Sequence, residues 1–406
     1  MSKVTSIPQL RFPEFSGEWK EKKLSDVAEI VGGGTPPTAV EKYWGGDIQW
    51  FTPTEIKNKY IVNSKRTITQ VGLDTSSARL LPKGTLLFSS RATVGEIGIA
   101  VQECTTNQGF QSFIVNKDND SEFLYNWIIK NKKEFIRRAS GSTFLEIGKS
   151  EIKKIKSNIP LLSEQQKIAA FLAAVDSKIE QLSKKQALLG EYKKGLMQQI
   201  FSQAIRFKAN DDSEFPDWEE KKLGDVCKLQ GGYAFKSAEF QKHGIPIIRI
   251  SNISNNNDFI DNRNLVYYNE IKNSDKFIIK NGDLIVAMSG ATTGKSSIYN
   301  LIEDAYLNQR VGLFKANNSL LDYGFLIQIV FSYIFATQLD SVLVAGAQPN
   351  VSSKDIEGFE ISLPSKIEQN KIANFLSSID SKIEQVGKQL DESKQFKKAL
   401  LQQMFV

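Results

Sequence analysis

Three short stretches of this sequence contain the letters of catalytic motifs. The segment GATTGKSS, Gly290 to Ser297, approximates the GxxxxGK[ST] loop that binds nucleotide phosphates. The segment PDWEEK, Pro216 to Lys221, contains the carboxylates and the lysine of a metal-dependent nuclease site. The segment GGGTPPT, Gly32 to Thr38, has the paired prolines of a methyltransferase tetrapeptide. Intact motifs of these kinds would predict nucleotide hydrolysis, DNA cleavage and methyl transfer, respectively.

The spacing of each motif argues against that chemistry. Only three residues separate Gly290 from Gly294 instead of four, and the matching stretch RATVGEIG has Glu96 where Lys295 stands. The acidic residues of PDWEEK are nearly adjacent, whereas nuclease carboxylates must converge from separate strands. No FxGxG cofactor loop accompanies GGGTPPT. We therefore predict a glycine-rich turn at Lys295, a capped entry to a globular head at PDWEEK, and no catalytic residues.

Residues that bind metals or form disulfides are scarce. His243 is the single histidine, and Cys104 and Cys227 are far apart and outside any CxxC pair. These counts argue against zinc sites, disulfide frameworks and histidine-based acid–base catalysis. We interpret His243 as a turn residue before Gly244, and we predict neither a metal nor a cofactor.

The composition is that of an ordinary globular protein. The 406 residues are 41% hydrophobic and 24% charged, which suffices for two or three domains. No apolar run reaches about 18 residues, and the N-terminal MSKVTSIPQLRFPEF lacks a signal-peptide core. We therefore expect a cytoplasmic protein without a membrane partner. The net charge of +6 and the pI near 8.9 suit a polyanionic partner, provided that the basic residues gather on one surface.

An internal repeat dominates the sequence. EWKEKKLSDVAEIVGG, from Glu18, matches DWEEKKLGDVCKLQGG, from Asp217, 199 positions later, with Trp19 and Trp218 as predicted core anchors. KGTLLFSSRATVG matches NGDLIVAMSGATTG, TNQGF matches LNQRV, and SEQQKIAAFLAAVDSKIEQ matches KIEQNKIANFLSSIDSKIEQ, the last pair at an offset of 204. The helical stretches agree closely, whereas the globular parts agree only at short motifs. The sequence thus predicts one scaffold that carries two divergent heads.

Each head is predicted to mix helices with many short strands. GTLLFSS and GDLIVAMS are apolar runs of strand length after a glycine turn. FLYNWIIKNKKEFIRRAS and LDYGFLIQIVFSYIFATQLD each predict one helix late in a head. The predicted fold class is therefore α/β (α+β). The predicted domains are 1–158 for the first head, 159–205 for its helix, 206–362 for the second head and 363–406 for its helix.

Both long helices carry an apolar seam with a seven-residue period. The seam residues are Ile168, Leu172, Val175, Ile179, Leu182, Leu189 and Leu196 in the first helix, and Ile372, Leu376, Ile379, Ile383, Val386, Leu390 and Leu400 in the second. Polar residues interrupt the seams at Gln186, Lys193, Ser393 and Lys397. One interpretation packs each helix only on its own head. The interpretation that we favour pairs the two as an antiparallel coiled coil, because their seams share phase and length, and makes them a spacer of roughly 57 Å.

These repeated segments resemble a known family. IPLLSEQQKIAAFLAAVDSKIEQ and LPSKIEQNKIANFLSSIDSKIEQ are similar to the conserved regions of the specificity subunits of type I restriction–modification systems. The head openings of the pattern W.EKKL.DV....GG, and the text between Gly33 and Trp50, resemble the same family. The similarity covers nearly the whole chain, and the doubled helix motif at this spacing is highly specific.

The resemblance implies a DNA-binding subunit without catalysis of its own. Each head would be a target-recognition domain that reads one half of a split site in double-stranded DNA. The helices would hold the heads apart and bind two methyltransferase (modification) subunits, to which motor-nuclease (restriction) subunits are added, and the methyl donor would bind a partner chain. Because the two heads differ in sequence, the two half-sites should differ as well.

Candidate DNA contacts are polar, basic and aromatic side chains in the loops of the heads. In the first head they are Thr35, Tyr43, Trp44, Arg91, Thr93, Asn107 and Gln108. In the second they are Tyr233, Phe235, Lys236, Arg249, Ser251, Asn252, Thr292, Lys295, Asn308, Gln309, Arg310, Gln348 and Asn350.

Several of these residues have an alternative, structural interpretation. The Asn-Gln pairs at 107–108 and 308–309 recur in both heads, so they either brace the fold or read bases. Tyr43 and Trp44 are either core residues or contacts, and Gln348 and Asn350 either touch DNA or cap the next element. Two other function classes also remain open: a self-sufficient nuclease or ATPase, and a stand-alone two-headed DNA-binding regulator. Apolar residues beside the seams, including Phe171, Ile200 and Phe375, favour partner docking over the regulator.

Overall fold

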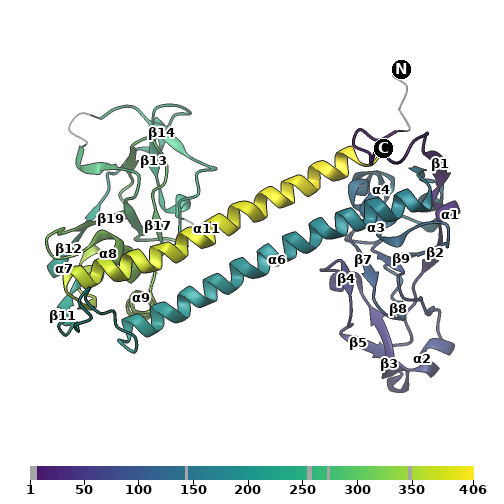
Figure 1. Cartoon of the computed structure of the whole chain (residues 1–406), viewed down its shortest axis with the longest axis horizontal. Coiled ribbons are helices and arrows are strands. Elements are labelled where there is room, and N and C mark those ends of the chain that lie inside the picture. Colours follow the sequence, from purple (N-terminus) through teal and green to yellow (C-terminus); the bar gives the residue numbers. More distant parts are fainter. Residues whose placement is uncertain (1–6, 142–144, 254–257, 272–274, 346–349) are drawn as a thin grey trace. The chain divides into compact units, whose positions relative to one another are not determined.

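The computed structural model describes residues 7–141, 145–253, 258–271, 275–345 and 350–406 (Figure 1). Its contacts divide the chain into two compact units. Unit 1 comprises residues 1–183 and 388–406, and unit 2 comprises residues 184–387. This division runs through both long helices, α6 (Leu162–Phe201) and α11 (Lys366–Gln403), so that each unit contains one head and a part of each helix. The domain boundaries predicted between heads and helices stay predictions.

Unit 1 mixes short strands with short helices. Its strands are β1 (Lys20–Lys23), β2 (Ala28–Gly32), β3 (Trp44–Phe51), β4 (Tyr60–Ile61), β5 (Arg66–Ile68), β6 (Leu86–Phe88), β7 (Ile97–Ala100), β8 (Cys104–Thr106), β9 (Gln111–Val115) and β10 (Lys156–Ile159). Its shorter helices are α1 (Leu24–Val27), α2 (Gln70–Asp74), α3 (Ser121–Lys130), α4 (Lys132–Arg138) and α5 (Lys149–Lys154), with 3-10 turns η1 (Glu41–Tyr43) and η2 (Pro53–Glu55). The strands form three sheets, ordered β2-β9-β6-β7-β4, β5-β3-β8 and β1-β10.

Unit 2 repeats much of this order of elements. Its strands are β11 (Glu219–Lys222), β12 (Cys227–Gly231), β13 (Ile245–Ile248), β14 (Val266–Tyr268), β15 (Ile278–Ile279), β16 (Leu284–Ala287), β17 (Ser296–Ile298), β18 (Ala305–Leu307), β19 (Val311–Ala316) and β20 (Glu360–Leu363). Its shorter helices are α7 (Leu223–Val226), α8 (Tyr323–Val330), α9 (Tyr333–Ala345) and α10 (Ser353–Glu357), with 3-10 turns η3 (Ser237–Glu239), η4 (Ile250–Asn252) and η5 (Asp275–Phe277). Among the described residues, no α-helix corresponding to α2 precedes β16. The sheets are ordered β12-β19-β16-β17, β14-β13-β18-β15 and β11-β20.

The duplication is visible in the pairing of strands. β3 lies between an antiparallel neighbour, β5, and a parallel one, β8, and β13 lies likewise between β14 and β18. The strand that opens each head pairs antiparallel with the strand that precedes the long helix, as β1 with β10 and β11 with β20. The predicted mixed α/β fold with two repeated heads is therefore confirmed.

One element prediction was wrong in both heads. The single helix predicted late in each head is broken into two, α3 and α4 in unit 1 and α8 and α9 in unit 2. In unit 1 the break is at Asn131, whose side-chain amide donates to the carbonyl of Trp127 at 2.9 Å. In unit 2 Ser332 donates to the carbonyl of Ile329 at 2.6 Å. Short polar side chains compete in this way for the carbonyls of a helix, and the apolar period continues across the break.

Two adjacent buried residues fasten the start of each long helix to its head. Glu164 accepts hydrogen bonds from Arg11 Nε at 2.7 Å and from Trp19 Nε1 at 3.2 Å. Gln165 accepts from the backbone N–H of Asp120, the N-cap of α3, at 2.9 Å. The equivalent group in unit 2 comprises Glu368, Arg206, Trp218, Gln369 and Asp322. A buried carboxylate needs such partners, which explains physically why the Glu-Gln pair stands in both copies.

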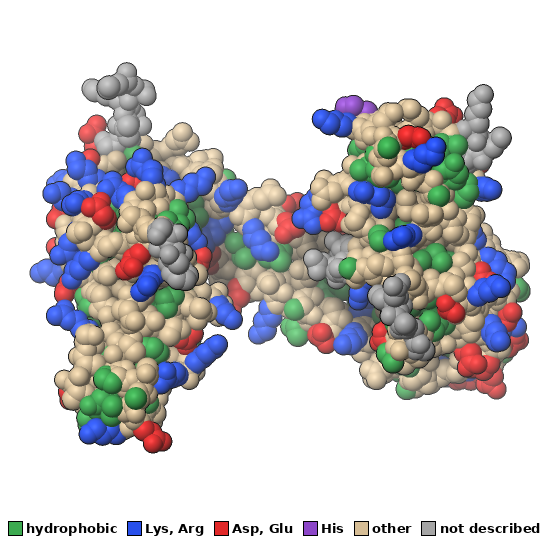
Figure 2. Space-filling view, turned by 180° about the vertical axis from the view of Figure 1, so that it is seen from behind, with side chains coloured by type: hydrophobic (Ala, Val, Ile, Leu, Met, Phe, Trp, Pro, Cys, Tyr) green, Lys and Arg blue, Asp and Glu red, His purple; other side chains and the backbone are tan. Residues whose placement is uncertain are grey.

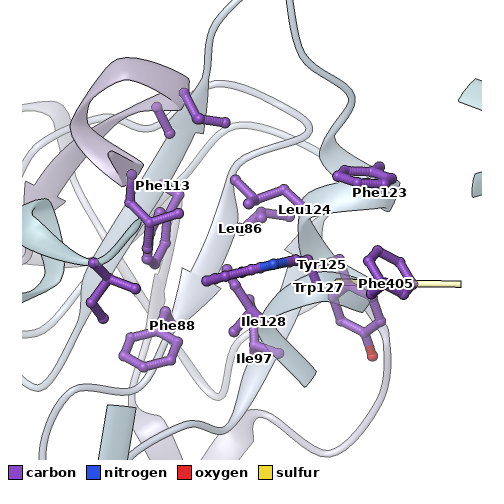
Figure 3. Close-up of a cluster of buried hydrophobic side chains, with 14 of the residues drawn as sticks. Leu86, Phe88, Ile97, Phe113, Phe123, Leu124, Tyr125, Trp127, Ile128 and Phe405 are labelled. Carbon is purple, nitrogen blue, oxygen red and sulfur yellow. The ribbon is translucent and has the colours of Figure 1, made fainter. Parts of the chain in front are cut away.

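A large apolar core holds unit 1 together (Figure 3). The side chains of Phe88 and Phe113 from the five-stranded sheet meet Trp127 and Phe123 from α3 in this core. Phe405, just past the end of α11, packs on Phe123 with ring centroids 5.1 Å apart. The last turn of α11 thus contributes to the core of the first head. Unit 2 mirrors this with Phe201 of α6 against Phe325, at 5.8 Å.

Within each unit, the segments of α6 and α11 are joined by an ion pair. In unit 1 Asp176 of α6 pairs with Lys397 of α11, and in unit 2 Lys193 of α6 pairs with Asp380 of α11 at 2.6 Å. Asp380 and Lys193 stand 204 positions from Asp176 and Lys397, so the two contacts are copies of one another. Lys193 and Lys397 interrupt the predicted seams for this reason. All the predicted seam residues are buried or half-buried.

The Asp176 contact extends into the first head. Lys59, before β4, lies 2.6 Å from Glu122 of α3 and 3.2 Å from Asp176. Burial alone would lower the pKa of Lys59, but the contacts with Glu122 and Asp176 outweigh it and raise that pKa. In unit 2 Gln328 of α8 donates to Asp380 at 3.2 Å. Each aspartate therefore ties one head to both long helices.

Among the described residues, no single helix is long and apolar enough to cross a lipid bilayer. The pair α8 and α9, bent by 54°, reaches the required length and composition only when the two helices are taken together.

Candidate nucleic-acid interface

Candidate contacts of the first head lie on loops that are hydrogen-bonded to one another. Thr35, after β2, donates from Oγ1 to Gln108 Oε1 at 2.5 Å, which ties it to the loop between β8 and β9. Ser90, after β6, donates from its N–H and its Oγ to the carbonyl of Gly109 at 2.8 and 3.1 Å. Thr35, Gln108 and the β6–β7 turn therefore form one loop surface, which includes Arg91.

The β6–β7 turn presents Arg91 and Thr93 under backbone strain. Ala92 has φ of 62°, in the left-handed region, which costs a residue with a Cβ about 1–2 kcal/mol. Its counterpart in unit 2 is Gly290, with φ of 85°. Arg91 is half exposed, and its guanidinium lies 3.7 Å from Glu146. Strained turns of this kind cluster at binding sites.

One glycine in each head lets the loops pack closely. A Cβ on Gly33 would lie 2.0 Å from the carbonyl oxygen of Asn107, and one on Gly232 would lie 2.2 Å from that of Leu307. Asn107 Oδ1 accepts from the N–H of Gly109 at 2.9 Å, and Asn308 Oδ1 accepts from the N–H of Arg310 at 3.4 Å. These contacts favour the bracing interpretation for the two asparagines, whereas Gln108 and Gln309 are exposed.

The first head contains a stacked cation, Arg66, that was not predicted from the sequence. The guanidinium carbon of Arg66, on β5, lies 3.5 Å from the ring centroid of Trp44 and 5.8 Å from that of Trp50. The two tryptophans meet edge to face at 5.0 Å. Trp44 is half-buried, and Tyr43 beside it is half-buried against α2, so both serve partly as core. Arg66 was not predicted because the pairing of β3 with β5 is needed to bring it to Trp44.

The corresponding loops of the second head hold an aromatic cluster. Tyr233 packs against Phe235 at 5.0 Å and against Phe277 at 5.3 Å. Phe235 also packs on Tyr268 at 5.0 Å and on Tyr306 at 5.4 Å. Phe235 therefore fills the cluster, whereas Tyr233 is exposed and available for stacking.

The polar candidates of the second head divide into exposed and structural residues. Ser251, Lys295, Gln309, Arg310 and Asn350 are exposed, as is Lys236, which pairs with Glu239 at 3.4 Å. Thr292 is half-buried and donates to the carbonyl of Ile250 at 3.0 Å. Asn350 forms an antiparallel bridge to Ser289. Gln348 lies outside the described residues.

The burial of Asn252 contradicts the prediction that this residue contacts DNA. Asn252 is only 1% exposed, its Oδ1 accepts from the N–H of Arg249 at 3.1 Å, and its Nδ2 donates to the carbonyl of Asp261 at 3.0 Å. Such burial removes Asn252 from any surface that DNA could reach. Arg249 itself is half-buried, donates to the carbonyl of Asn264 at 3.1 Å, and has a buried Nε without a hydrogen-bond partner in the described structure.

The apolar residues predicted to favour docking are also corrected. Ile200 is buried in the core of unit 2. Phe171 packs on Phe12 at 5.7 Å, and Phe375 packs on Phe207 at 5.5 Å, so segments of the same chain cover them. The apolar side chains that stay exposed on the long helices include Leu188, Tyr192 (56%) and Phe396 (53%). Tyr192 and Phe396 are equivalent positions of the repeat.

The motif-like stretches have ordinary structural roles. Glu219 of PDWEEK pairs with Lys221 at 2.7 Å on an exposed strand. No group of three or more His, Cys, Asp or Glu suited to a metal occurs within the described ranges. Burial raises the pKa of both Cys104 and Cys227 to about 12, which keeps these thiols protonated and unreactive.

By its fold, the chain is a tandem duplication in which each head has its own core and shares both long helices. The chain belongs to the family defined by the type I restriction modification DNA specificity domain, whose model matches residues 16–189 and again residues 216–392.

Individual relatives agree with this assignment. The type I restriction enzyme MjaIX specificity subunit of Methanocaldococcus jannaschii is 32% identical, over 95% of this chain and 92% of the relative. The MjaVIII specificity subunit of the same organism is 26% identical, over 97% of this chain and 92% of the relative. In fold, the S subunit of the type I restriction–modification system from M. genitalium is similar, with a TM-score of 0.64 and 18% identity over 98% of this chain and 99% of that one.

Proposed function

We propose that the chain is the DNA sequence-specificity subunit of a type I restriction–modification complex, without catalysis of its own. The first head reads one half of a split DNA site and the second head reads the other half. The observation that carries this proposal is the contrast between a repeated frame and unlike loops. The same glycine and asparagine positions recur in both heads, whereas the first head has Arg66 stacked on a tryptophan and the second has an aromatic cluster around Tyr233.

The two long helices act in this proposal as the spacer that sets the gap between the half-sites. Support comes from the contacts inside the two units. Asp176 with Lys397 and Lys193 with Asp380 are the same contact repeated, one in each unit, and this repetition is what an antiparallel pairing of α6 and α11 at one register would produce. A helix pair of fixed register is stiff enough to define a distance.

The same helices dock two methyltransferase subunits, to which the restriction subunits are added in the full complex. Support comes from Tyr192 and Phe396, exposed aromatics at equivalent positions of the repeat. An equivalent pair predicts two copies of one partner. Aromatic side chains of this size are the usual anchors of protein interfaces. The methyl donor binds to that partner rather than to this chain.

Genome-wide methylation mapping tests the proposal. The chain is expressed with its methyltransferase subunit, and the expected result is a motif of two unlike half-sites around a fixed run of unspecified bases. Replacing one head should change one half-site only, as should Arg91→Ala. If methylation is absent and the purified chain alone binds one contiguous site, the protein is instead a stand-alone DNA-binding regulator.

The docking surface has its own test. Tyr192→Glu and Phe396→Glu should each weaken binding of one methyltransferase subunit, because a charge replaces an apolar anchor, while the melting temperature stays unchanged. Stoichiometry measured by native mass spectrometry should fall from two subunits to one in either single variant. Retention of both subunits in the double variant would place the docking surface elsewhere.

A further inference from the structure

The two heads carry opposite charge on one matching surface. Residues 132–156, which span α4, α5 and the start of β10, contain eight basic and three acidic side chains, a net charge of +5. The matching residues 333–360, from α9 to the start of β20, contain one basic and four acidic side chains, a net charge of −3. The whole chain has a net charge of +6, so a single surface of unit 1 accounts for most of the excess. We call the described part of this stretch, residues 132–141 and 145–156, the basic face.

The elements of the basic face are contiguous. Arg138 of α4 lies 3.8 Å from Glu151 of α5. α5 leads into β10, which pairs with the lysine-rich strand β1. Figure 2 shows Lys and Arg side chains gathered along the left edge of the molecule, where β1 and α1 of unit 1 lie. Lys133, Lys149 and Lys153 are exposed and have no ion pair within the described residues.

The fold does not need these charges. α10 occupies the place of α5 with Asp355 and Glu357, and the strand after it, β20, pairs with β11 as β10 pairs with β1. Lys132 and Lys133 begin α4, and Lys149 begins α5, where the helix dipole disfavours a positive charge. These lysines thus oppose helix stability instead of supporting it, which argues against an ordinary solvated surface.

The basic face adjoins the loop that presents Arg91. The segment between α4 and α5 is bridged to it, because Glu146 pairs with both Arg91 and Ser140. Lys132 also pairs with Glu96 at the end of the same β6–β7 turn, at 2.5 Å. Duplex DNA that contacts Arg91 would therefore find a positively charged surface directly beside it.

We propose that the basic face binds the phosphate backbone of the duplex that flanks the half-site read by the first head. This inference rests on the proposed function and extends it, because the matching residues of the second head carry a net negative charge. The complex therefore holds DNA asymmetrically, with a sequence-independent contact on one side of its split site. Lysine contacts to phosphates are independent of sequence and strongly dependent on salt.

The test measures binding of the chain, assembled with its methyltransferase subunits, to duplexes that carry the methylated motif. The flank next to the first half-site is about 3 or about 25 base pairs long, and the opposite flank is varied in the same way. We expect that only the first truncation weakens binding. Lys133→Glu with Lys149→Glu should remove this dependence on the flank and lower the slope of affinity against salt by about 1 for each lysine. The methylated motif should stay unchanged.

Lys83→Glu with Lys117→Glu is the matched control. Both residues are exposed lysines of the same head outside the basic face, and the net charge changes equally. Equal effects of both flanks in the wild type, or equal losses in the control, would overturn the proposal while methylation of the split motif still upheld the proposed function. Loss of a methyltransferase subunit in the Lys133 and Lys149 variant would instead make the face a protein-docking site and refute DNA binding there. As a converse test, Asp340→Lys with Glu360→Lys should create flank dependence on the second side.

Discussion

The side-chain geometry of Arg66 suits contact with a DNA base. Its guanidinium is stacked on Trp44, and no carboxylate pairs with it in the described structure. By contrast, Arg11, Arg206 and Arg263 are tied up in ion pairs. Stacking fixes the plane of the guanidinium and leaves its donors free, which suits bidentate contact with a guanine.

Arg66→Ala should make one base of the first half-site degenerate and leave the second half-site intact. A bidentate arginine contact is worth about 1–3 kcal/mol of discrimination between bases. Arg66→Lys keeps the charge but not the fork of donors, so it should lose the base preference while retaining more affinity than the alanine variant. Methylation mapping reads both results. Arg79→Ala, which removes an exposed arginine paired with Glu29, is the control, and an unaltered motif in Arg66→Ala would exclude base reading by this residue.

The two cysteines report separately on the two units, since Cys104 lies in unit 1 and Cys227 in unit 2. Burial raises the pKa of each to about 12, so thiol reagents at pH 8 should label neither in the folded chain. An unfolded thiol ionises near pH 8.5, so stability should fall as the pH rises above that value. Labelling at increasing denaturant, with Cys104→Ser and Cys227→Ser to assign each signal, should follow unfolding of each unit. Rapid labelling without denaturant would contradict the burial.

At the scale of elements, the long helices were the most predictable part of the chain and their contacts the least. The seven-residue period places α6 and α11 within a few residues of their observed bounds. In the sequence, Lys193 and Lys397 only interrupt the seams. Their role could not be predicted, because the aspartates that they pair with lie on the other long helix. Arg66 and Trp44 are likewise joined by strand pairing, which no local pattern reveals. Asn252 is polar, but its side chain satisfies buried backbone groups instead of facing solvent.

The ion pair of unit 2 can be tested by exchanging its charges. Lys193→Asp should leave two carboxylates facing each other, and Asp380→Lys should leave two ammonium groups facing each other. Each single variant should lower the free energy of unfolding by about 3–5 kcal/mol, because Lys193 is almost buried. The double exchange should recover much of that loss, as measured by urea unfolding in a double-mutant cycle. Additive losses in the double variant would show that the two residues do not interact. Lys194→Asp, at an exposed neighbouring position, is the control.

At the scale of the whole molecule, the spacer proposal makes a quantitative prediction. Four residues inserted after Gln181 in α6 and four after Gln385 in α11 fall between the two ion pairs. Asp176 with Lys397 and Lys193 with Asp380 then keep their partners within each unit. Four residues lengthen a helix by about 6 Å, which corresponds to about two base pairs along B-DNA.

The insertion in both helices should therefore widen the unspecified gap by about two base pairs and leave both half-sites unchanged. An insertion in α6 alone shifts one helix against the other, so it must break one ion pair and mismatch the seams. That variant should be less stable than the doubly inserted one, and its gap less sharply defined. Methylation mapping gives the gap, and thermal unfolding gives the stability. A gap that stays constant in the doubly inserted chain would mean that contacts outside the helices set the distance, and the spacer proposal would fail.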